Sequence, residues 1–174
     1  SESLGQLQLQ SGSLTVTSSL AAAGQTSRLT FDSVSRQTGA VAFVSTGFAD
    51  ARNQIVFTTA PSLAGAAHSD IVPYMVARSN GGVGADAVLV THDGDGTALR
   101  AYGTGPNEGF ATAESAFVST TNARPPAGTT LLSGGRTVQA LVLDDGVNIA
   151  GSGANRGHFG SPTVWRGLLC RQAA

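Results

Sequence analysis

The sequence predicts an all-β fold, and within that class a segment of a parallel β-solenoid with turn-rich excursions. Short stretches in which apolar and polar residues alternate recur along the chain, and such alternation is typical of half-buried strands. The 174 residues include 23 glycines and only 6% aromatic residues, which favours tight turns and a thin core. The pattern at the start of the chain also returns near its end, as a repeat architecture predicts.

Nine segments are expected to form strands, because their side chains alternate and clusters of Gly, Pro, Asn and Asp separate them. In chain order they are residues 7–9, 14–17, 28–31, 40–44, 54–58, 71–76, 87–91, 98–102 and 138–143. A short helix is predicted only at residues 107–117, and the glycine and threonine content of that stretch argues against it.

The first predicted strands have a second copy near the end of the chain. Leu7 and Leu9 align with Leu141 and Leu143, 134 positions later, and a glycine turn follows each pair. In a parallel solenoid the inward apolar residues of successive rungs stack into one dry column. We therefore expect two equivalent rungs with residues 28–130 as an excursion between them. The alternative is an antiparallel β-sandwich, in which the same stretch would be one hairpin.

Four stretches carry a resemblance to a known family. They are "SLTVTSSL" (13–20), "NQIVFTTAPSL" (53–63), "THDGDGTALRAY" (91–102) and "TTLLSGGRTVQALVLDDGVNIAGSG" (129–153). In composition and order they resemble the repeat units of autotransporter-type passenger regions, which are long surface proteins of bacteria with a Gram-negative envelope. The resemblance covers roughly residues 7–153. It implies a right-handed β-solenoid, an extracellular or cell-surface location, and a structural or adhesive role without catalysis.

The expected organisation is a single β-rich repeat domain over residues 1–155, followed by an irregular tail or cap over residues 156–174. The tail lacks strand alternation and contains the only tryptophan, Trp165, and the only cysteine, Cys170. Unlike the family it resembles, the chain shows no signal peptide and no membrane-barrel domain. Because it also begins at Ser1, we expect a processed product or a fragment of a longer protein.

Charge and hydropathy argue against two classes of partner. The formal net charge is −1, and all ten positive side chains are arginines, so no basic field is available for nucleic acid. Apolar runs such as residues 85–90 are far shorter than the roughly 20 residues that span a bilayer, so no membrane insertion is expected. The lone Cys170 cannot form an internal disulfide.

The sharpest local motif is His92-Asp93-Gly94-Asp95-Gly96. Asp93 and Asp95 offer carboxylate oxygens two residues apart, and such oxygens are the ligands that calcium prefers. The alternative is an Asp-Gly turn in which both side chains accept hydrogen bonds from the backbone. Calcium at Asp93 and Asp95 is the only metal or cofactor that the sequence suggests.

No catalytic residue is predicted. Carboxylates on an exposed turn lack the apolar pocket that raises a pKa for acid catalysis, and this applies to Asp93 and Asp95 as well as to Asp144 and Asp145. No Gly-x-Ser-x-Gly elbow is present, and each histidine, at 68, 92 and 158, lies in a predicted turn. The glycine runs at 103–109 and 151–157 both miss the dinucleotide fingerprint by one residue.

The predicted function is a non-catalytic structural or adhesive segment of a secreted or cell-surface bacterial protein. Its partners would be surface glycans or neighbouring copies of the same protein, bound by outward rows of Thr, Ser, Gln and Asn. The rival is a carbohydrate-binding β-sandwich module, with calcium at Asp93 and Asp95 and rings that stack on sugars at Tyr74, Tyr102 and Trp165. A third hypothesis is a polysaccharide hydrolase on the same solenoid, with His92 and the two aspartates at its centre.

Overall fold

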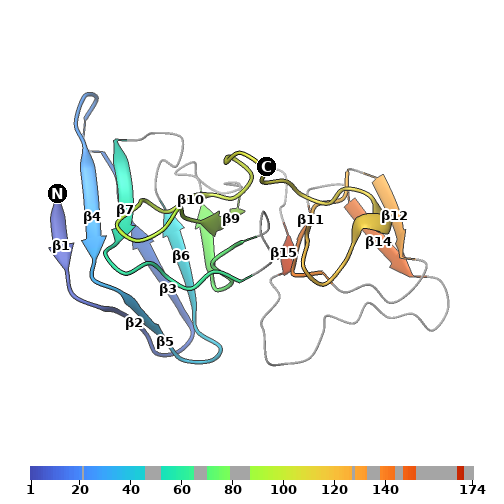
Figure 1. The fold of residues 1–174 in the computed structure, drawn as a ribbon, viewed down its shortest axis with the longest axis horizontal. Helices are drawn as coiled ribbons and strands as arrows, with labels where there is room; N and C mark the ends of the chain where they lie inside the picture. Colours follow the sequence, from blue (N-terminus) through green and yellow to red (C-terminus); the bar gives the residue numbers. More distant parts are fainter. Residues whose placement is uncertain are drawn as a thin grey trace.

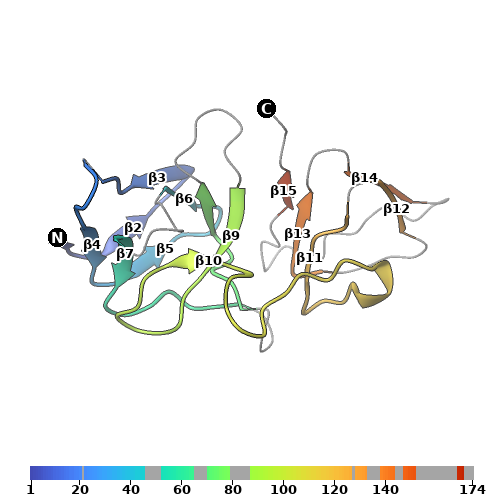
Figure 2. The same cartoon turned by 90° about the horizontal axis from the view of Figure 1, so that it is seen from above.

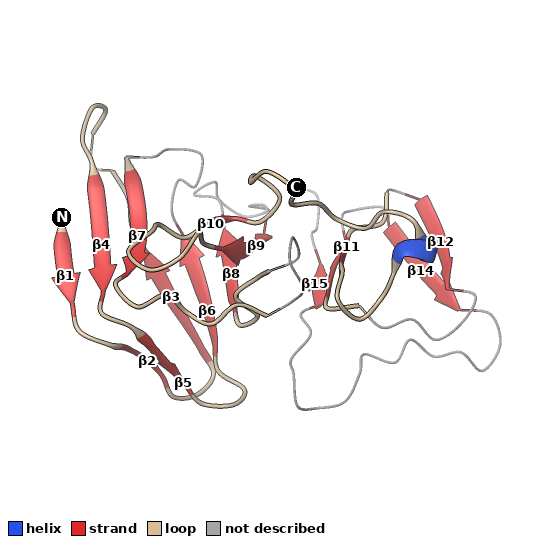
Figure 3. Cartoon of the chain, in the orientation of Figure 1, coloured by secondary structure: helices blue, strands red, loops and turns tan. Residues whose placement is uncertain are grey.

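The computed structural model is all-β, as predicted, and Figure 3 shows strands joined by turns and loops. It describes residues 1–20, 22–45, 52–64, 70–78, 87–126, 128–132, 138–143, 147–151 and 168–170. Their strands are β1 (Glu2–Leu4), β2 (Leu7–Leu9), β3 (Ser13–Thr17), β4 (Ser27–Phe31), β5 (Val34–Arg36), β6 (Val41–Ser45), β7 (Asn53–Phe57), β8 (Met75–Arg78), β9 (Ala87–Thr91), β10 (Arg100–Ala101), β11 (Asn122–Ala123), β12 (Gly128–Leu132), β13 (Ala140–Leu143), β14 (Val147–Gly151) and β15 (Leu168–Cys170).

The first three strands are each covered by the strand that follows about 27 residues later. We call β1–β3 the first coil and β4–β6 the second coil (Figure 1). Glu2 pairs with Leu29, 27 positions on, and Leu7 pairs with Val34 at the same offset. All three strand pairs between these coils are parallel. The stack continues in the same sense as β4 pairs with β7 and β6 pairs with β8.

The predicted excursion over residues 28–130 is therefore wrong, since β4 begins the second coil directly. The two matching stretches at the ends of the chain do not pair with each other. β2 pairs with β5, whereas β13 pairs with β11 and β15. Strands can stack when the side chains at paired positions are compatible, even if they are not similar. Leu9, for example, pairs with Arg36, so the stacked strands do not resemble each other in sequence.

The direction of pairing changes once the chain reaches β8. β9 runs antiparallel to β8, and β10 runs antiparallel to β9. The five-stranded sheet β10-β9-β8-β6-β3 is therefore mixed. Parallel pairing resumes in the sheets β11-β13-β15 and β12-β14. In both views the strands β1–β10 lie at one end of the long axis and β11–β15 at the other (Figures 1 and 2).

The largest core cluster among the described residues lies inside the stacked coils. Phe31 and Phe57 are register partners, and their rings stack with centroids 5.4 Å apart. Val44, Ile55 and Met75 are also almost completely buried in this cluster. Because each coil covers the apolar face of the one beside it, thin layers of small side chains make a continuous core. A second cluster joins the two ends of the molecule, with Ile71, Leu89, Tyr102, Ala140 and Val142.

Two local predictions differ from the structure. The predicted helix at 107–117 is absent apart from one 3-10 turn, Glu114–Ala116. Asn107 has φ of 66°, which is incompatible with a right-handed helix at that residue. The tail at 156–174, predicted to be irregular, contains strand β15, and its other residues lie outside the described part of the chain. Among the described residues, no helix has the length and apolar character of a membrane span.

Candidate functional site

The predicted Asp-Gly turn lies directly after β9. Gly94 has φ of 130° and Gly96 has φ of 70°, conformations that glycine adopts without steric cost. The hydroxyl of Thr97 closes the turn by donating to the carbonyl oxygen of Gly94 at 2.6 Å, and it accepts the Asp93 N–H at 3.2 Å. The sequence motif thus forms a tight, internally hydrogen-bonded turn.

The carboxylates of Asp93 and Asp95 are held by different partners. Asp93 forms an ion pair with Arg100, with 2.6 Å between Oδ1 and Nη2. This hydrogen bond holds the pKa of the Asp93 carboxyl below its usual value. Asp95 Oδ1 accepts the backbone N–H of Ala60 at 2.7 Å. A calcium ion at Asp93 would compete with the Arg100 guanidinium, and calcium binding at Asp93 and Asp95 stays a prediction. In the described part of the chain, no three His, Cys, Asp or Glu residues are grouped to hold a metal.

Arg100 also binds Glu108, so one guanidinium joins two carboxylates. Its Nη2 and Nη1 lie 2.6 and 2.9 Å from Glu108 Oε1 and Oε2, a bidentate geometry. Glu108 Oε2 also accepts the N–H groups of Gly103 at 2.8 Å and Gly105 at 3.2 Å. The Arg100 hydrogen bond, with these backbone donors, lowers the pKa of Glu108 against the opposing effect of burial.

This cluster explains the glycine run at 103–109. The loop does place backbone N–H groups around an anion, but the anion is the chain's own Glu108 carboxylate. A Cβ atom at Gly105 would lie 2.9 Å from both Arg100 Nη2 and Glu108 Oε1, so any larger residue there would have to displace the ends of these two side chains. The sequence alone predicts a role for neither Arg100 nor Glu108, and the glycine run at 103–109, which contains Glu108, is the only sequence signal near them.

His92 is buried and uses both ring nitrogens. Its Nδ1 accepts the Gly94 N–H at 3.1 Å, which assigns the proton to Nε2. Nε2 then donates to the carbonyl oxygen of Pro61 at 2.8 Å. These bonds fix the end of β9 to the 58–64 segment. In this arrangement His92 has no free lone pair with which to take a proton from a substrate.

The two described tyrosines are packing residues. Tyr102 is buried edge-on against Phe110, with centroids 5.1 Å apart, and its hydroxyl donates to Gly109 at 3.0 Å. The Arg36 guanidinium lies 4.9 Å from the centroid of Tyr74, and burial raises the pKa of that tyrosine. Tyr102 therefore has no exposed ring face on which a sugar could stack. One face of the Tyr74 ring is covered by the Arg36 guanidinium. His68, His158, Asp144, Asp145 and Trp165 lie outside the described residues, as does the glycine run at 151–157 apart from Gly151, the last residue of β14.

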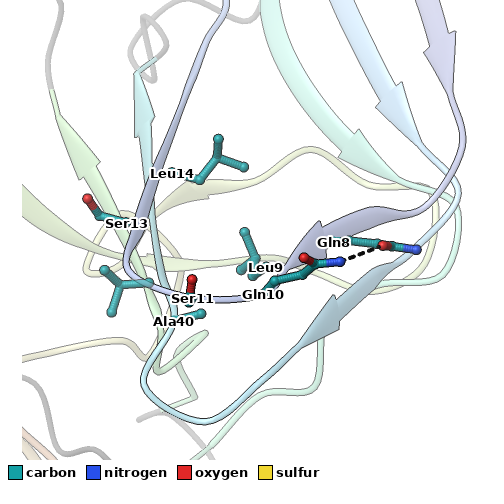
Figure 4. A pocket seen from close by; sticks show the side chains of 8 residues that line it. Gln8, Leu9, Gln10, Ser11, Ser13, Leu14 and Ala40 are labelled. Atoms are coloured by element: carbon teal, nitrogen blue, oxygen red, sulfur yellow. Dashed lines mark hydrogen bonds between the residues drawn. The ribbon is translucent and has the colours of Figure 1, made fainter.

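A groove of about 390 Å³ opens on the first coil, at the corner between β2 and β3 (Figure 4). Its lining combines amides, hydroxyls and aliphatic side chains: Gln8, Leu9, Gln10, Ser11, Ser13, Leu14, Ala40 and Val41. Two glutamines contact each other there at 3.5 Å, a weak bond that leaves most of their hydrogen-bonding capacity to other partners. The groove therefore presents hydrogen-bonding groups and apolar surface side by side.

Comparison with known proteins gives no match, whether with protein-family models, curated proteins or solved structures. The resemblance to autotransporter-type passenger repeats therefore remains a prediction from the sequence.

Proposed function

We propose that this chain is a β-solenoid segment of a secreted or surface-displayed bacterial protein and that it serves as a structural stalk or adhesive surface without catalysis. The observation that carries the proposal is the pairing of the first two coils, in which three successive strands each lie parallel to the strand of the next coil. Such coil-on-coil pairing extends a protein in one direction, because each coil is covered only by its neighbours.

The strand directions favour this architecture over the rival sandwich. Eight of the ten strand pairs among the described strands are parallel, and the two antiparallel pairs both involve β9. Sandwich modules of the immunoglobulin type are built from antiparallel sheets. In the proposed solenoid, β9 is a local change of strand direction. A sandwich of that type would require most of the pairs, which are parallel here, to be antiparallel instead.

The exposed surface of the first coil suits weak, repeated contacts. Gln8, Gln10, Thr15 and Thr17 all face solvent and alternate with apolar or half-buried residues. Their amides and hydroxyls both donate and accept hydrogen bonds, as the hydroxyl groups of glycans do. Surface glycans and neighbouring copies are the partners that we propose for this face.

The polar side chains of the 91–110 region are bound to other groups of the same chain, and this supports a role without catalysis. His92, Asp93, Asp95, Arg100 and Glu108 all have partners within the chain. We interpret these hydrogen bonds and ion pairs as structural contacts that hold the loops of this region against the strands.

Labelling of intact cells tests the location and the role. An antibody raised against this chain is applied to intact bacteria that produce it, with a cytoplasmic protein as the control. We expect the antibody to label intact cells, and purified chain on beads to bind glycan-coated surfaces above the level of albumin-coated beads. Labelling that requires cell lysis contradicts the surface location, and turnover of any polysaccharide contradicts the absence of catalysis.

A further inference from the structure

We propose that residues 87–101 form a built-in cap that ends the parallel stack and blocks the addition of further strands at β7 and β8. This inference rests on the proposed solenoid. We call residues 87–101 the cap, and β7, the 58–64 segment and β8 together the third coil. Both antiparallel ladders among the described strands involve β9, which lies in the cap. In both views β9 lies on the side of the stack that faces β15 (Figures 1 and 2).

The cap covers the edge of β7, the last strand of the sheet β1-β4-β7. Gly96 donates its backbone N–H to the carbonyl oxygen of Phe57 at 2.9 Å, and Leu99 donates to that of Ile55 at 2.8 Å. The Leu99 side chain is 5% exposed and belongs to the same core cluster as Ile55 and Phe57. The cap therefore closes both the backbone edge and the apolar core at this strand.

The cap also binds the other two parts of the third coil. β9 pairs antiparallel with β8 over three register positions. Between the two strand contacts, the turn after β9 holds the 58–64 segment. His92 Nε2 donates to the carbonyl oxygen of Pro61 at 2.8 Å, and Asp95 Oδ1 accepts the Ala60 N–H at 2.7 Å. All three parts of the third coil thus make hydrogen bonds to one continuous segment of chain.

The cap has features by which natural proteins prevent strand addition, whereas the strand that it covers lacks them. Short edge strands, charges and interruptions of the extended backbone all block an incoming strand. β10 has only two residues, Gly94 and Gly96 have positive φ, and Asp93 and Arg100 carry charges. In contrast, β7 has five residues with the sequence NQIVF and no charge. An uncharged, apolar strand of this kind pairs readily with other chains when its edge is exposed.

Two double variants of the whole 174-residue chain test the inference. The cap variant, Asp95→Ala with Thr97→Val, removes the acceptor of the Ala60 N–H and the hydroxyl that closes the turn on Gly94. The control variant, Asp32→Ala with Thr15→Val, makes the same chemical changes at exposed positions in the first two coils. The two variants therefore have the same net charge and the same composition.

Hydrogen exchange read by mass spectrometry measures how firmly the cap is held. We expect the amides of residues 94–101 to exchange at least about tenfold faster in the cap variant than in the wild type, because local opening no longer breaks these hydrogen bonds. The amides of β4 should keep their wild-type rates in both variants. Unchanged exchange at 94–101 overturns the inference that these contacts hold the cap. Equally faster exchange in β4 overturns it too, because the segment would then open only together with the stack.

Assembly of the same proteins measures the blocking role. During incubation at a common concentration, we expect the cap variant to form thioflavin-positive assemblies at least about tenfold faster than the wild type and the control, since its β7 edge is open more often. Faster exchange without faster assembly rejects the blocking role, and equal assembly of the control variant rejects it as well. These outcomes leave the parallel pairing of the first two coils, and hence the proposed solenoid, intact. A compact particle in solution scattering would instead reject the solenoid and the cap with it.

Discussion

Arg100 is the residue with the most electrostatic partners in the described 91–110 region. It joins Asp93, on the turn after β9, to Glu108, in the glycine loop. Arg100→Gln removes both ion pairs and leaves the Glu108 carboxylate, which is only 11% exposed, without its counter-charge. We expect the free energy of unfolding to fall by about 2 kcal/mol. Urea denaturation measures the change, with Arg28→Gln as the control because, among the described residues, Arg28 makes one long hydrogen bond, 3.5 Å to the Gly96 carbonyl oxygen. Equal losses in both variants would contradict the assignment.

The same cluster sets a dependence on pH. The pKa values of Asp93 and Glu108 are both lowered in the folded chain, chiefly by hydrogen bonds from Arg100. Below about pH 4.5 the unfolded chain takes up protons more readily than the folded chain, so stability falls as pH decreases. We expect the melting temperature to decline from about pH 5 to pH 2.5, and to decline less steeply in Arg100→Gln. Parallel declines in the two proteins would show that other carboxyl groups control acid unfolding.

For individual residues, the sequence predicted the turns but not the ion pairs. The Asp-Gly motif led to a correct turn, because glycine at positive φ and side-chain acceptors act locally. The link from Arg100 to Glu108 depends on the path of the 103–109 loop, which no short-range rule specifies. The dinucleotide fingerprint that this loop misses by one residue uses glycine N–H groups to hold an anion, and here the N–H groups of Gly103 and Gly105 donate to Glu108 instead.

A buried polar cluster ties three successive layers of the stack together. Ser18, after β3, donates to Asn53 Oδ1 at 2.6 Å and lies 3.0 Å from the hydroxyl of Ser27 at the start of β4. Asn53 begins β7, and its Nδ2 donates to the Ser18 carbonyl oxygen at 2.7 Å. The cluster thus fixes the corner at which β4 and β7 begin.

Asn53→Ala removes two of these bonds and leaves the buried Ser18 carbonyl without its donor. We expect a loss of about 2–3 kcal/mol in the free energy of unfolding, because an unsatisfied buried polar group keeps its full desolvation cost. Gln54→Ala, in the same strand and half-buried, is the matched control. In a double-mutant cycle with Ser18→Ala, the two losses should be clearly less than additive. Additive losses would mean that the two side chains act independently.

Strand positions were easier to predict than strand partners. The alternating pattern located β2, β3, β4, β7, β9 and β13 to within about two residues, because alternation follows from the geometry of a single strand. The spacing of 27 residues between coils was missed. At that spacing Leu9 meets Arg36, whose Nε donates to Ala40 at 2.7 Å and whose guanidinium lies over Tyr74. A polar side chain with its own local partners thus interrupts the apolar column, so the two coils do not repeat the same residue pattern.

The whole molecule combines parallel stacking with one reversal, and this combination predicts its shape. The stack of β1–β8 continues along one direction, and the cluster of Ile71, Tyr102, Ala140 and Val142 packs it against the strands that follow β10. A compact domain of this length has a radius of gyration of about 16 Å. Because thin coils stacked along one axis place the same mass farther from the centre, we expect solution scattering of the monomer at low concentration to give a larger value and an asymmetric distance distribution. A radius near 16 Å with a symmetric distribution would contradict the proposed solenoid and favour a sandwich-like packing of the same strands.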